Sequence, residues 1–275
     1  KVYNKDGKLS QANLYVRVYN EEDVEKNRRF IKFVTEKLSN YNIATKLIIL
    51  QEQKDIAGLI REHKPDFAIN RSRNCEVALM LEEAGVKVFN SSKVTKIANN
   101  KEETFKYLDG TVEYMPFFNS ENKEKINYPC IIKSVSGHGG SQVFMANNEE
   151  EAHNIEEILK DVKYIYQECS TDLGKDVRVY IVGNKIVASM LRTSTESFKS
   201  NYSLGGSARP YELNNNEKSM VRKILKKFPI NYGGIDFIFN NGKAVFNEIE
   251  DAVGARMIYE KTDIDIVGIF VDYIV

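Results

Sequence analysis

Three acidic side chains near the C-terminus are the clearest candidates for chemistry in this sequence. Asp236 lies in the predicted strand IDFIF, Glu248 and Glu250 lie in the next predicted strand, and Asn240-Asn241-Gly242 separates the strands. A three-residue turn ending in glycine would place the three carboxylates on one face of the hairpin, whereas a two-residue Asn-Gly turn would place Asp236 and Glu248 on opposite faces. Carboxylates on apolar strands are costly unless a cation compensates them, and Mg²⁺ prefers carboxylate oxygens shared with phosphates. We therefore predict the three-residue turn and a magnesium site, the alternative being an exposed edge with solvated acids.

A glycine-rich segment, residues 136–141, joins the predicted strands PCIIKS and QVFMA. Glycines let backbone N–H groups approach phosphates closely, and Lys133 lies on the strand that enters the loop. The loop residues that are candidates for phosphate binding are Ser136, Gly137, Gly139 and Gly140. The segment lacks the P-loop motif, and taken alone it is more typical of a simple turn.

The first ninety residues contain the elements that would position a substrate. Strands are predicted over 13–19, 44–50, 66–70 and 86–89, with helices over 21–40, 54–63 and 74–84. This alternation predicts a parallel, doubly wound sheet, which binds ligands beyond the carboxyl ends of its strands. The segment Arg71-Ser72-Arg73-Asn74 lies at such an end. Two interpretations stand: an anion site for a substrate carboxylate, or a polar loop in which Asn74 caps the next helix.

The pattern changes after residue 90 from α/β to α+β. Helices are predicted over 92–108 (interrupted at Asn99-Asn100), 149–160 and 218–227, and strands over 164–168, 175–182, 185–192, 234–239 and 243–249. We therefore expect an N-terminal domain over residues 1–90 and a second domain over 91–275, with subdomains of about 91–168 and 169–275.

The composition argues against several classes of protein. Lys+Arg and Asp+Glu are both 39 in 275 residues, and this zero net charge disfavours nucleic-acid binding through bulk electrostatics. No apolar run approaches the ~20 residues that span a bilayer. The cysteines, Cys75, Cys130 and Cys169, are far apart and form no CxxC. We expect no disulfide framework and no zinc site, but reduced thiols and a cytoplasmic setting.

In its order of features the chain resembles the ATP-grasp superfamily, most closely the RimK-like amino-acid ligases. The resemblance covers residues 90–270. It rests on Lys101 after Asn100, Lys133 before the glycine loop, Gln167-Glu168-Cys169, Asp176-Val177-Arg178, Arg192, Lys199-Ser200-Asn201, Gly205-Gly206, GID at 234–236 and NEIED at 247–251. It implies a pre-ATP-grasp (Rossmann-like) domain followed by an ATP-grasp fold whose two subdomains clamp the nucleotide.

The resemblance also implies residue roles. Lys101 and Lys133 would contact the phosphates of ATP. The peptide groups around Gln167, Glu168 and Cys169 would form the adenine hinge, and Asp176 would hold the ribose hydroxyls. Arg178 and Arg192 would face phosphate or the acyl intermediate, and Asn201 the reacting carboxylate. Asp236, Glu248 and Glu250 would bind Mg²⁺. The family usually has Asn at the position of Glu250, followed by a small-Pro-Gly turn, whereas residues 251–256 here read DAVGAR.

The implied activity is an ATP-dependent carboxylate–amine ligase that forms an amide through an acyl phosphate and releases ADP and phosphate. Its substrate would be a small-molecule amino acid or peptide, with an acidic amino acid as one candidate that Arg71, Arg73, Arg209 and Arg256 slightly favour. Neither nucleic acid nor membrane is expected as a partner. The sequence does not decide the oligomeric state, and a homo-oligomer is one of the alternatives. Two other functions also stay open: an ATP-grasp small-molecule kinase, and a non-catalytic nucleotide-binding regulatory protein.

Overall fold

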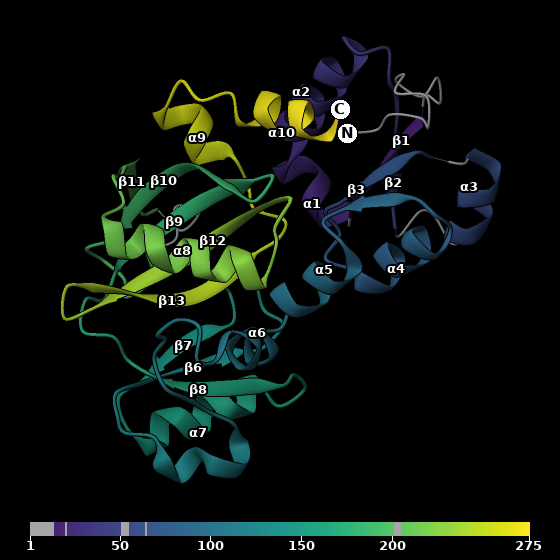
Figure 1. Cartoon of the computed structure of the whole chain (residues 1–275). Coiled ribbons are helices and arrows are strands. Elements are labelled where there is room, and N and C mark those ends of the chain that lie inside the picture. Colours follow the sequence, from purple (N-terminus) through teal and green to yellow (C-terminus); the bar gives the residue numbers. More distant parts are fainter. Residues whose placement is uncertain (1–13, 20, 51–54, 64, 201–204) are drawn as a thin grey trace.

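Three β-sheets form the framework of the protein (Figure 1). The computed structural model describes residues 14–19, 21–50, 55–63, 65–200 and 205–275. The N-terminal sheet is parallel and has the order β2-β1-β3-β4. Its strands are β1 (Leu14–Tyr19), β2 (Ala44–Ile49), β3 (Phe67–Asn70) and β4 (Lys87–Phe89).

Helices cover both faces of the N-terminal sheet because its strands are apolar on both sides. The helices are α1 (Glu21–Lys26), α2 (Arg28–Ser39), α3 (Ile56–His63) and α4 (Cys75–Glu83). Phe67 and Ile69 pack in one core with α2, whereas Ala68 between them packs in another core with α3 and α4. The prediction of a single helix over 21–40 is wrong, because the helix is interrupted at Asn27 (φ −105°, ψ 8°), which lies between α1 and α2.

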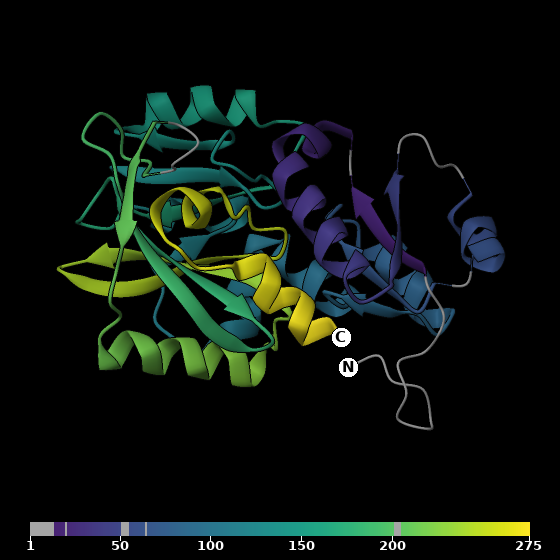
Figure 2. The ribbon, with the colours of Figure 1, turned by 90° about the horizontal axis from the view of Figure 1, so that it is seen from above.

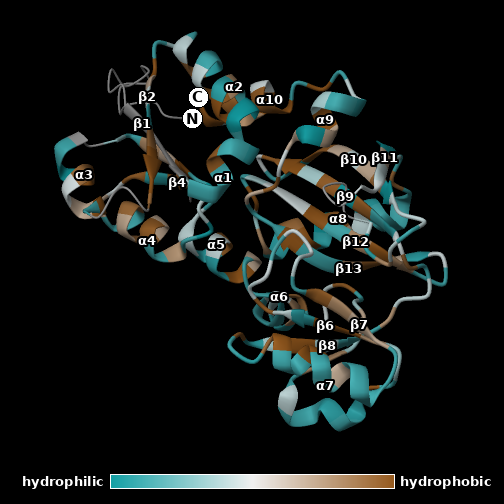
Figure 3. Ribbon diagram, turned by 180° about the vertical axis from the view of Figure 1, so that it is seen from behind, coloured by the Kyte–Doolittle hydropathy of each residue, from teal (hydrophilic) through white to brown (hydrophobic). Residues whose placement is uncertain are grey.

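A smaller antiparallel sheet follows two short helices, α5 (Ser92–Ala98) and α6 (Lys101–Leu108). Asn100 caps α6 by accepting a hydrogen bond from the backbone N–H of Glu103. The sheet has the order β5-β8-β6-β7. Its elements are β5 (Phe117–Phe118), a 3₁₀ helix η1 (Ser120–Lys125), β6 (Cys130–Ser134), β7 (Val143–Ala146), α7 (Glu149–Ile158) and β8 (Tyr164–Glu168). Most of the α7 ribbon has hydrophilic colours in Figure 3, and its buried residues Ala152 and Ile155 pack on this sheet.

The largest sheet is antiparallel and has the order β11-β10-β9-β12-β13. Its strands are β9 (Lys175–Val182), β10 (Lys185–Thr193), β11 (Ser207–Pro210), β12 (Tyr232–Asn240) and β13 (Lys243–Glu250). α8 (Asn215–Lys227) covers one face through Val221, Ile224 and Leu225. α9 (Arg256–Lys261) and α10 (Ile266–Ile274) follow, and α10 packs against α2 of the N-terminal part (Figure 2). No helix in the described ranges is long and apolar enough to cross a membrane.

The β12–β13 hairpin corrects one prediction. Its turn has two residues, Asn241 and Gly242, with φ 51° and 73°, and not the three that we expected. A two-residue turn alone would put Asp236 and Glu248 on opposite faces. A β-bulge reverses this, because the register shifts between Asp236 and Phe237 and leaves Asn247 without a partner on β12. Asp236 therefore pairs directly with Glu248 on one face of the sheet.

Candidate active site

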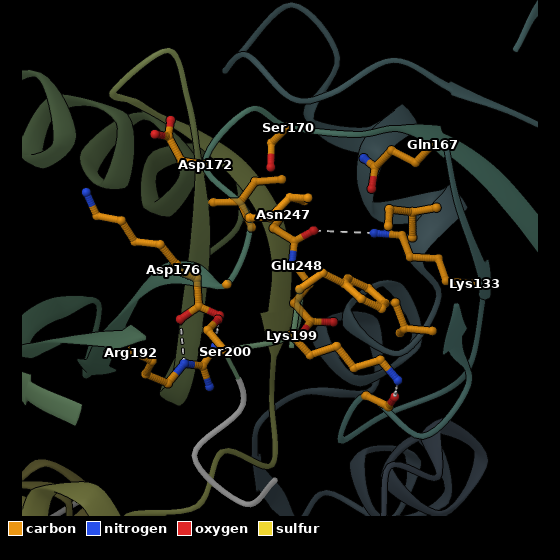
Figure 4. A pocket seen from close by; sticks show the side chains of 18 of the residues that line it. Lys133, Gln167, Ser170, Asp172, Asp176, Arg192, Lys199, Ser200, Asn247 and Glu248 are labelled. Carbon is orange, nitrogen blue, oxygen red and sulfur yellow. Dashed lines mark hydrogen bonds and ion pairs between the residues drawn. The ribbon is translucent and has the colours of Figure 1, made fainter. Parts of the chain in front are cut away.

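A pocket lies between the small and the large antiparallel sheets, beneath the glycine loop 136–141 (Figure 4). The structure brings together in it the predicted residues Lys101, Lys133, Gly137, Gly140, Gln167, Glu168, Asp176, Arg192 and Glu248. Other predicted residues do not line it: Ser136, Gly139, Cys169, Arg178, Asp236 and Glu250. Asn201 lies outside the described residues. The pocket therefore joins segments from both expected subdomains of the second domain.

The two predicted lysines enter the pocket from different elements. Lys101 is the first residue of α6 and donates a hydrogen bond to the carbonyl of Gly137. Lys133 on β6 points toward Asn247, whose Oδ1 is 3.3 Å from its Nζ (Figure 4). Lys133 is only 3% exposed, and burial together with the nearby Lys101 lowers its pKa to about 7. An anion in the pocket would compensate this unfavourable positive charge.

A third lysine, Lys199, was missed as a site residue by the sequence analysis. Its Nζ lies 2.8 Å from the carbonyl oxygen of Gly140, and burial lowers its pKa. Gly139 and Gly140 have φ of 66° and 77°, a region in which a side chain is strained, so the loop needs glycine there. Lysines from α6 and from the segment after β10 thus hold the two ends of the glycine loop. Apart from the KSN run, the local sequence carries no signal for this contact.

The opposite wall of the pocket comes from β8 and the loop after it. Gln167 is 2% exposed, and its amide donates to the carbonyl of Met115 at 3.1 Å. Asp172 accepts a hydrogen bond from the backbone N–H of Gly242 at 2.9 Å, which ties this loop to the β12–β13 turn. Apolar side chains complete the lining, from Ile131, Val143, Leu173, Phe198 and Ile238. An apolar slot beside the end of β8 suits a flat heterocycle.

A network of arginines and carboxylates forms the floor beside the pocket. Arg178 donates to Asp236 at 2.8 and 2.7 Å, and Arg192 donates to Asp176 at 2.6 and 2.7 Å. Arg192 also reaches Asp236 at 2.7 Å. Burial alone would raise the pKa of Asp236, but the two arginines outweigh it and hold that pKa below its ordinary value. Asp236 is therefore a carboxylate that two guanidinium groups already compensate.

The three carboxylates predicted to bind metal do not converge. Each faces a basic partner: Asp236 the two arginines, Glu248 the ammonium of Lys101 at 3.6 Å, and Glu250 the guanidinium of Arg178 at 2.5 Å. Within the described ranges, no group of three or more His, Cys, Asp or Glu side chains could hold a metal ion. Asn247, which the bulge turns into the pocket beside Glu248, is a second residue that the sequence analysis missed. A bulge leaves little trace in local sequence.

The segment after β3 behaves as a capped polar loop. The side chain of Asn74 accepts hydrogen bonds from the N–H groups of Glu76 and Val77 at 2.9 and 3.0 Å. Arg73 forms an ion pair with Asp23 at 2.5 Å, and Arg71 donates to main-chain carbonyls of the other domain. Both arginines thus have partners within the protein. This arrangement agrees with the capping interpretation for Asn74, while the Nε and Nη1 of Arg71 are buried without a hydrogen-bond partner among the described residues.

Comparison with known proteins places this site in a family. The family model for the RimK-like ATP-grasp domain matches residues 76–274. The chain belongs to this family. Relatives include the uncharacterized protein MG011 of Mycoplasma genitalium, 29% identical over 256 residues, 92% of this chain and 88% of that protein. Another is N-acetylaspartylglutamate synthase A of Homo sapiens, 30% identical over 224 residues, which covers 76% of this chain but only 57% of the human protein.

Solved structures share the fold at low sequence identity. The D-alanine–D-alanine ligase from Bacillus anthracis, complexed with ATP, has a TM-score of 0.75 at 14% identity and covers 96% of both chains. The ATP-grasp ligase PsnB, complexed with a minimal precursor, has a TM-score of 0.70 at 19% identity and covers 94% of this chain and 98% of that one. The predictions of an ATP-grasp fold and of an ATP-dependent carboxylate–amine ligase are confirmed.

Proposed function

We propose that this protein joins a carboxylate to an amine through an acyl phosphate, with an acidic amino acid or a peptide as one substrate. The observation that carries the proposal is the pocket in which Lys101, Lys133 and Glu248 meet beneath the glycine loop. A substrate carboxylate oxygen attacks the γ-phosphorus of ATP, the bond to the β,γ-bridging oxygen breaks, and ADP leaves. The amine then attacks the acyl carbon, phosphate leaves with the C–O bonding pair, and the amine loses a proton.

The chain's own residues act by holding charge and excluding water, because phosphoryl transfer needs positioning more than covalent help. Lys101 and Lys133 would exchange their contacts with Gly137 and Asn247 for phosphate oxygens. The peptide groups of 167–169 would hold the adenine, and Asp176 the ribose. Arg192 and Arg178 would face the transferring phosphoryl group, and Asn201 the substrate carboxylate. The remaining loop positions, Ser136, Gly139 and Gly140, would close over the phosphates.

The residues on the acidic face fit Mg²⁺ in part. Glu248 lines the pocket, its side chain is 27% exposed, and its lysine partner at 3.6 Å lies beyond hydrogen-bond distance. Its oxygens are therefore available to a hard cation. Asp236 and Glu250 would join it only by loosening their arginine contacts. Such an ion, when bound with ATP, neutralises charge on the phosphates.

Relatives support the substrate class. The human relative's name, N-acetylaspartylglutamate synthase, and that of a probable alpha-L-glutamate ligase from Maridesulfovibrio salexigens both include glutamate. We propose an acidic amino acid as the first candidate. The division into domains 1–90 and 91–275, the doubly wound N-terminal fold, and a cytoplasmic setting with free thiols belong to the same proposal.

The test is ADP release from Mg-ATP with pairs of amino acids and peptides, with the products identified by mass spectrometry. The ligase requires a carboxylate and an amine together and yields an amide, ADP and phosphate. A phosphorylated acceptor would show a kinase, and no turnover with any pair would favour a nucleotide-binding regulatory protein. Glu248→Gln should abolish turnover, whereas Glu157→Gln on the exposed face of α7 should leave it unchanged.

A further inference from the structure

The turn that follows β13, residues 251–254, is held by side chains and not by a backbone ladder. Four consecutive carbonyl oxygens in it each accept a hydrogen bond from a side chain. The donors are Asn90 to Asp251 at 3.2 Å, Arg71 to Ala252 and Val253 at 3.0 and 2.9 Å, and Tyr180 to Gly254 at 3.1 Å. Three of the four acceptors lie in buried residues, where an unpaired carbonyl would be costly. The position of the turn therefore depends on these donors.

Arg71 reaches the turn from the N-terminal sheet. It follows the last residue of β3, is 2% exposed, and also donates to Asn27 at 3.0 Å. Its guanidinium lies over the ring of Phe30 at 4.3 Å and near that of Tyr232 at 5.4 Å. One nitrogen, Nη2, donates to both carbonyls and to Asn27, and the planar group is held in place against the aromatic rings, a stacked position that an ammonium group cannot reproduce. Arg71 thus fixes the turn relative to the N-terminal sheet.

The turn is the direct continuation of the strand that carries the acidic side chains. Glu250 is the last residue of β13 and contacts Arg178, and Glu248 two residues earlier lines the pocket. A displacement of residues 251–254 would be transmitted to both acids, because Glu248, Ile249 and Glu250 form the end of β13 that leads directly into the turn. The side chains that would meet Mg-ATP are thereby anchored to another domain.

We propose that Arg71 is a positioning residue of the ligase site. From the N-terminal sheet it sets the place of the 251–254 turn, and through the turn it sets the place of Glu248 and Glu250. The part of this proposal that concerns metal rests on the proposed function. The part that concerns the turn does not, because it follows from the contacts of Arg71 alone.

The first measurement tests the turn without any ligand. In Arg71→Lys, backbone amides of the peptide spanning about residues 247–256 should exchange hydrogen roughly tenfold faster than in the parent protein, because the shorter ammonium group loses the ring contacts that place a donor against both carbonyls. The control is Lys37→Met, which removes an ion pair between α2 and α10, at the same interface but away from the turn. It should leave exchange in this peptide unchanged.

The second measurement tests the effect on the site. The ratio of the dissociation constants for ADP in EDTA and in Mg²⁺ reports how well metal and nucleotide bind together. This ratio should fall about tenfold in Arg71→Lys, while the dissociation constant in EDTA should stay within about twofold of the parental value. The control variant Lys37→Met should have the same ratio as the parent protein. With substrates from the ADP-release screen, kcat should fall and the KM for Mg-ATP should rise together with the dissociation constant of ADP in Mg²⁺. If Arg71→Lys only damaged the folded structure, the dissociation constants for ADP in EDTA and in Mg²⁺ would rise together.

The outcomes separate the two proposals. A folded Arg71→Lys variant with parental exchange and a parental ratio would overturn the role of Arg71. Should that variant fail to fold, Tyr180→Phe removes only the donor to Gly254 and should shift exchange and ratio in the same direction by about twofold; no shift would again overturn the proposal. A parent protein that binds ADP equally well with and without Mg²⁺ would refute the proposed metal face, while the exchange data still decide whether Arg71 holds the turn.

Discussion

Lys133 should make nucleotide binding depend on pH in a range where most lysines do not titrate. Its ammonium is buried beside Lys101, and its pKa is lowered to about 7 by burial first and by Lys101 second. In the free protein Lys133 is therefore neutral above pH 7. A bound phosphate favours the charged form and raises this pKa, so binding takes up a proton. The sign follows: affinity is highest below the lowered pKa and falls as the pH rises above it.

The magnitude follows from the shift. Each pH unit above the free-protein pKa costs about 1.4 kcal/mol of binding free energy, as long as the pKa in the complex stays higher than the pH. Between about pH 7.5 and 9.5 the dissociation constant of ADP should rise roughly 100-fold, or ~2.7 kcal/mol. Phosphate groups with a second pKa of about 6 are fully charged throughout this range. His138, whose pKa is lowered from its ordinary value, is neutral there as well.

The assay is isothermal titration of ADP in EDTA at three pH values within this range, which keeps metal hydrolysis out of the result. Lys133→Met should bind more weakly at the lowest pH and lose most of the slope. Lys160→Met, at an exposed position, is the matched control. Lys199→Met is measured alongside, because burial lowers the pKa of Lys199 too. A flat dissociation constant in the parent protein, or an unchanged slope in Lys133→Met, would refute the reasoning.

Three further outcomes are expected. Mg-ATP at about 100 times its dissociation constant should stabilise the protein by ~2.7 kcal/mol, and an unchanged melting temperature would contradict the nucleotide site. Backbone amides of the glycine loop 136–141 should exchange hydrogen more slowly when nucleotide binds. Equal exchange rates with and without nucleotide would count against its role as a lid. Asp236→Asn should lower the free energy of unfolding by about 1–3 kcal/mol in urea, since Arg178 and Arg192 lose their hydrogen bonds to this carboxylate and keep only Glu250 and Asp176 as charged partners. A loss below about 1 kcal/mol would show that the arginines find other partners.

The elements were predictable wherever local patterns decide them. The Asn99-Asn100 interruption was visible because asparagine is a good helix cap, and the structure starts α6 after it. The break at Asn27 was not, because the apolar spacing of one helix runs from Val24 before it to Phe30, Ile31, Val34 and Leu38 after it. The β12–β13 turn was misjudged for a similar reason. The Asn-Gly pair is typical of a two-residue turn. The bulge that returns Asp236 and Glu248 to one face of the sheet arises in the pairing of β13 with β12, away from the turn.

The sequence predicts many of the residues that gather at the site, but not which of them line the pocket and which pair with each other beside it. Residues named from the resemblance, such as Lys101, Lys133 and Asp176, line one pocket although they are far apart in sequence. Arg178 and Asp236 do not line it, because they pair directly across β9 and β12 and neutralise each other there. Their separation of 58 residues leaves no local trace of this register. The contact between Lys199 and Gly140, 59 residues apart, is hidden for the same reason.

Glu250 stands at a position where the family resemblance leads us to expect Asn, and its contact with Arg178 bears on what a carboxylate does there. With the usual Asn, Asp236 would be the carboxylate that neutralises Arg178. Here Arg178 contacts two carboxylates, Asp236 at 2.7 Å and Glu250 at 2.5 Å. The network of two arginines and three acids, with Asp176, therefore carries one excess negative charge. An anionic substrate group that approaches Arg178 must displace the carboxylate of Glu250. The free-energy cost of this displacement is lowest when a cation binds the released carboxylate. In the proposed function, Glu250 would therefore couple metal binding to the access of the substrate to Arg178.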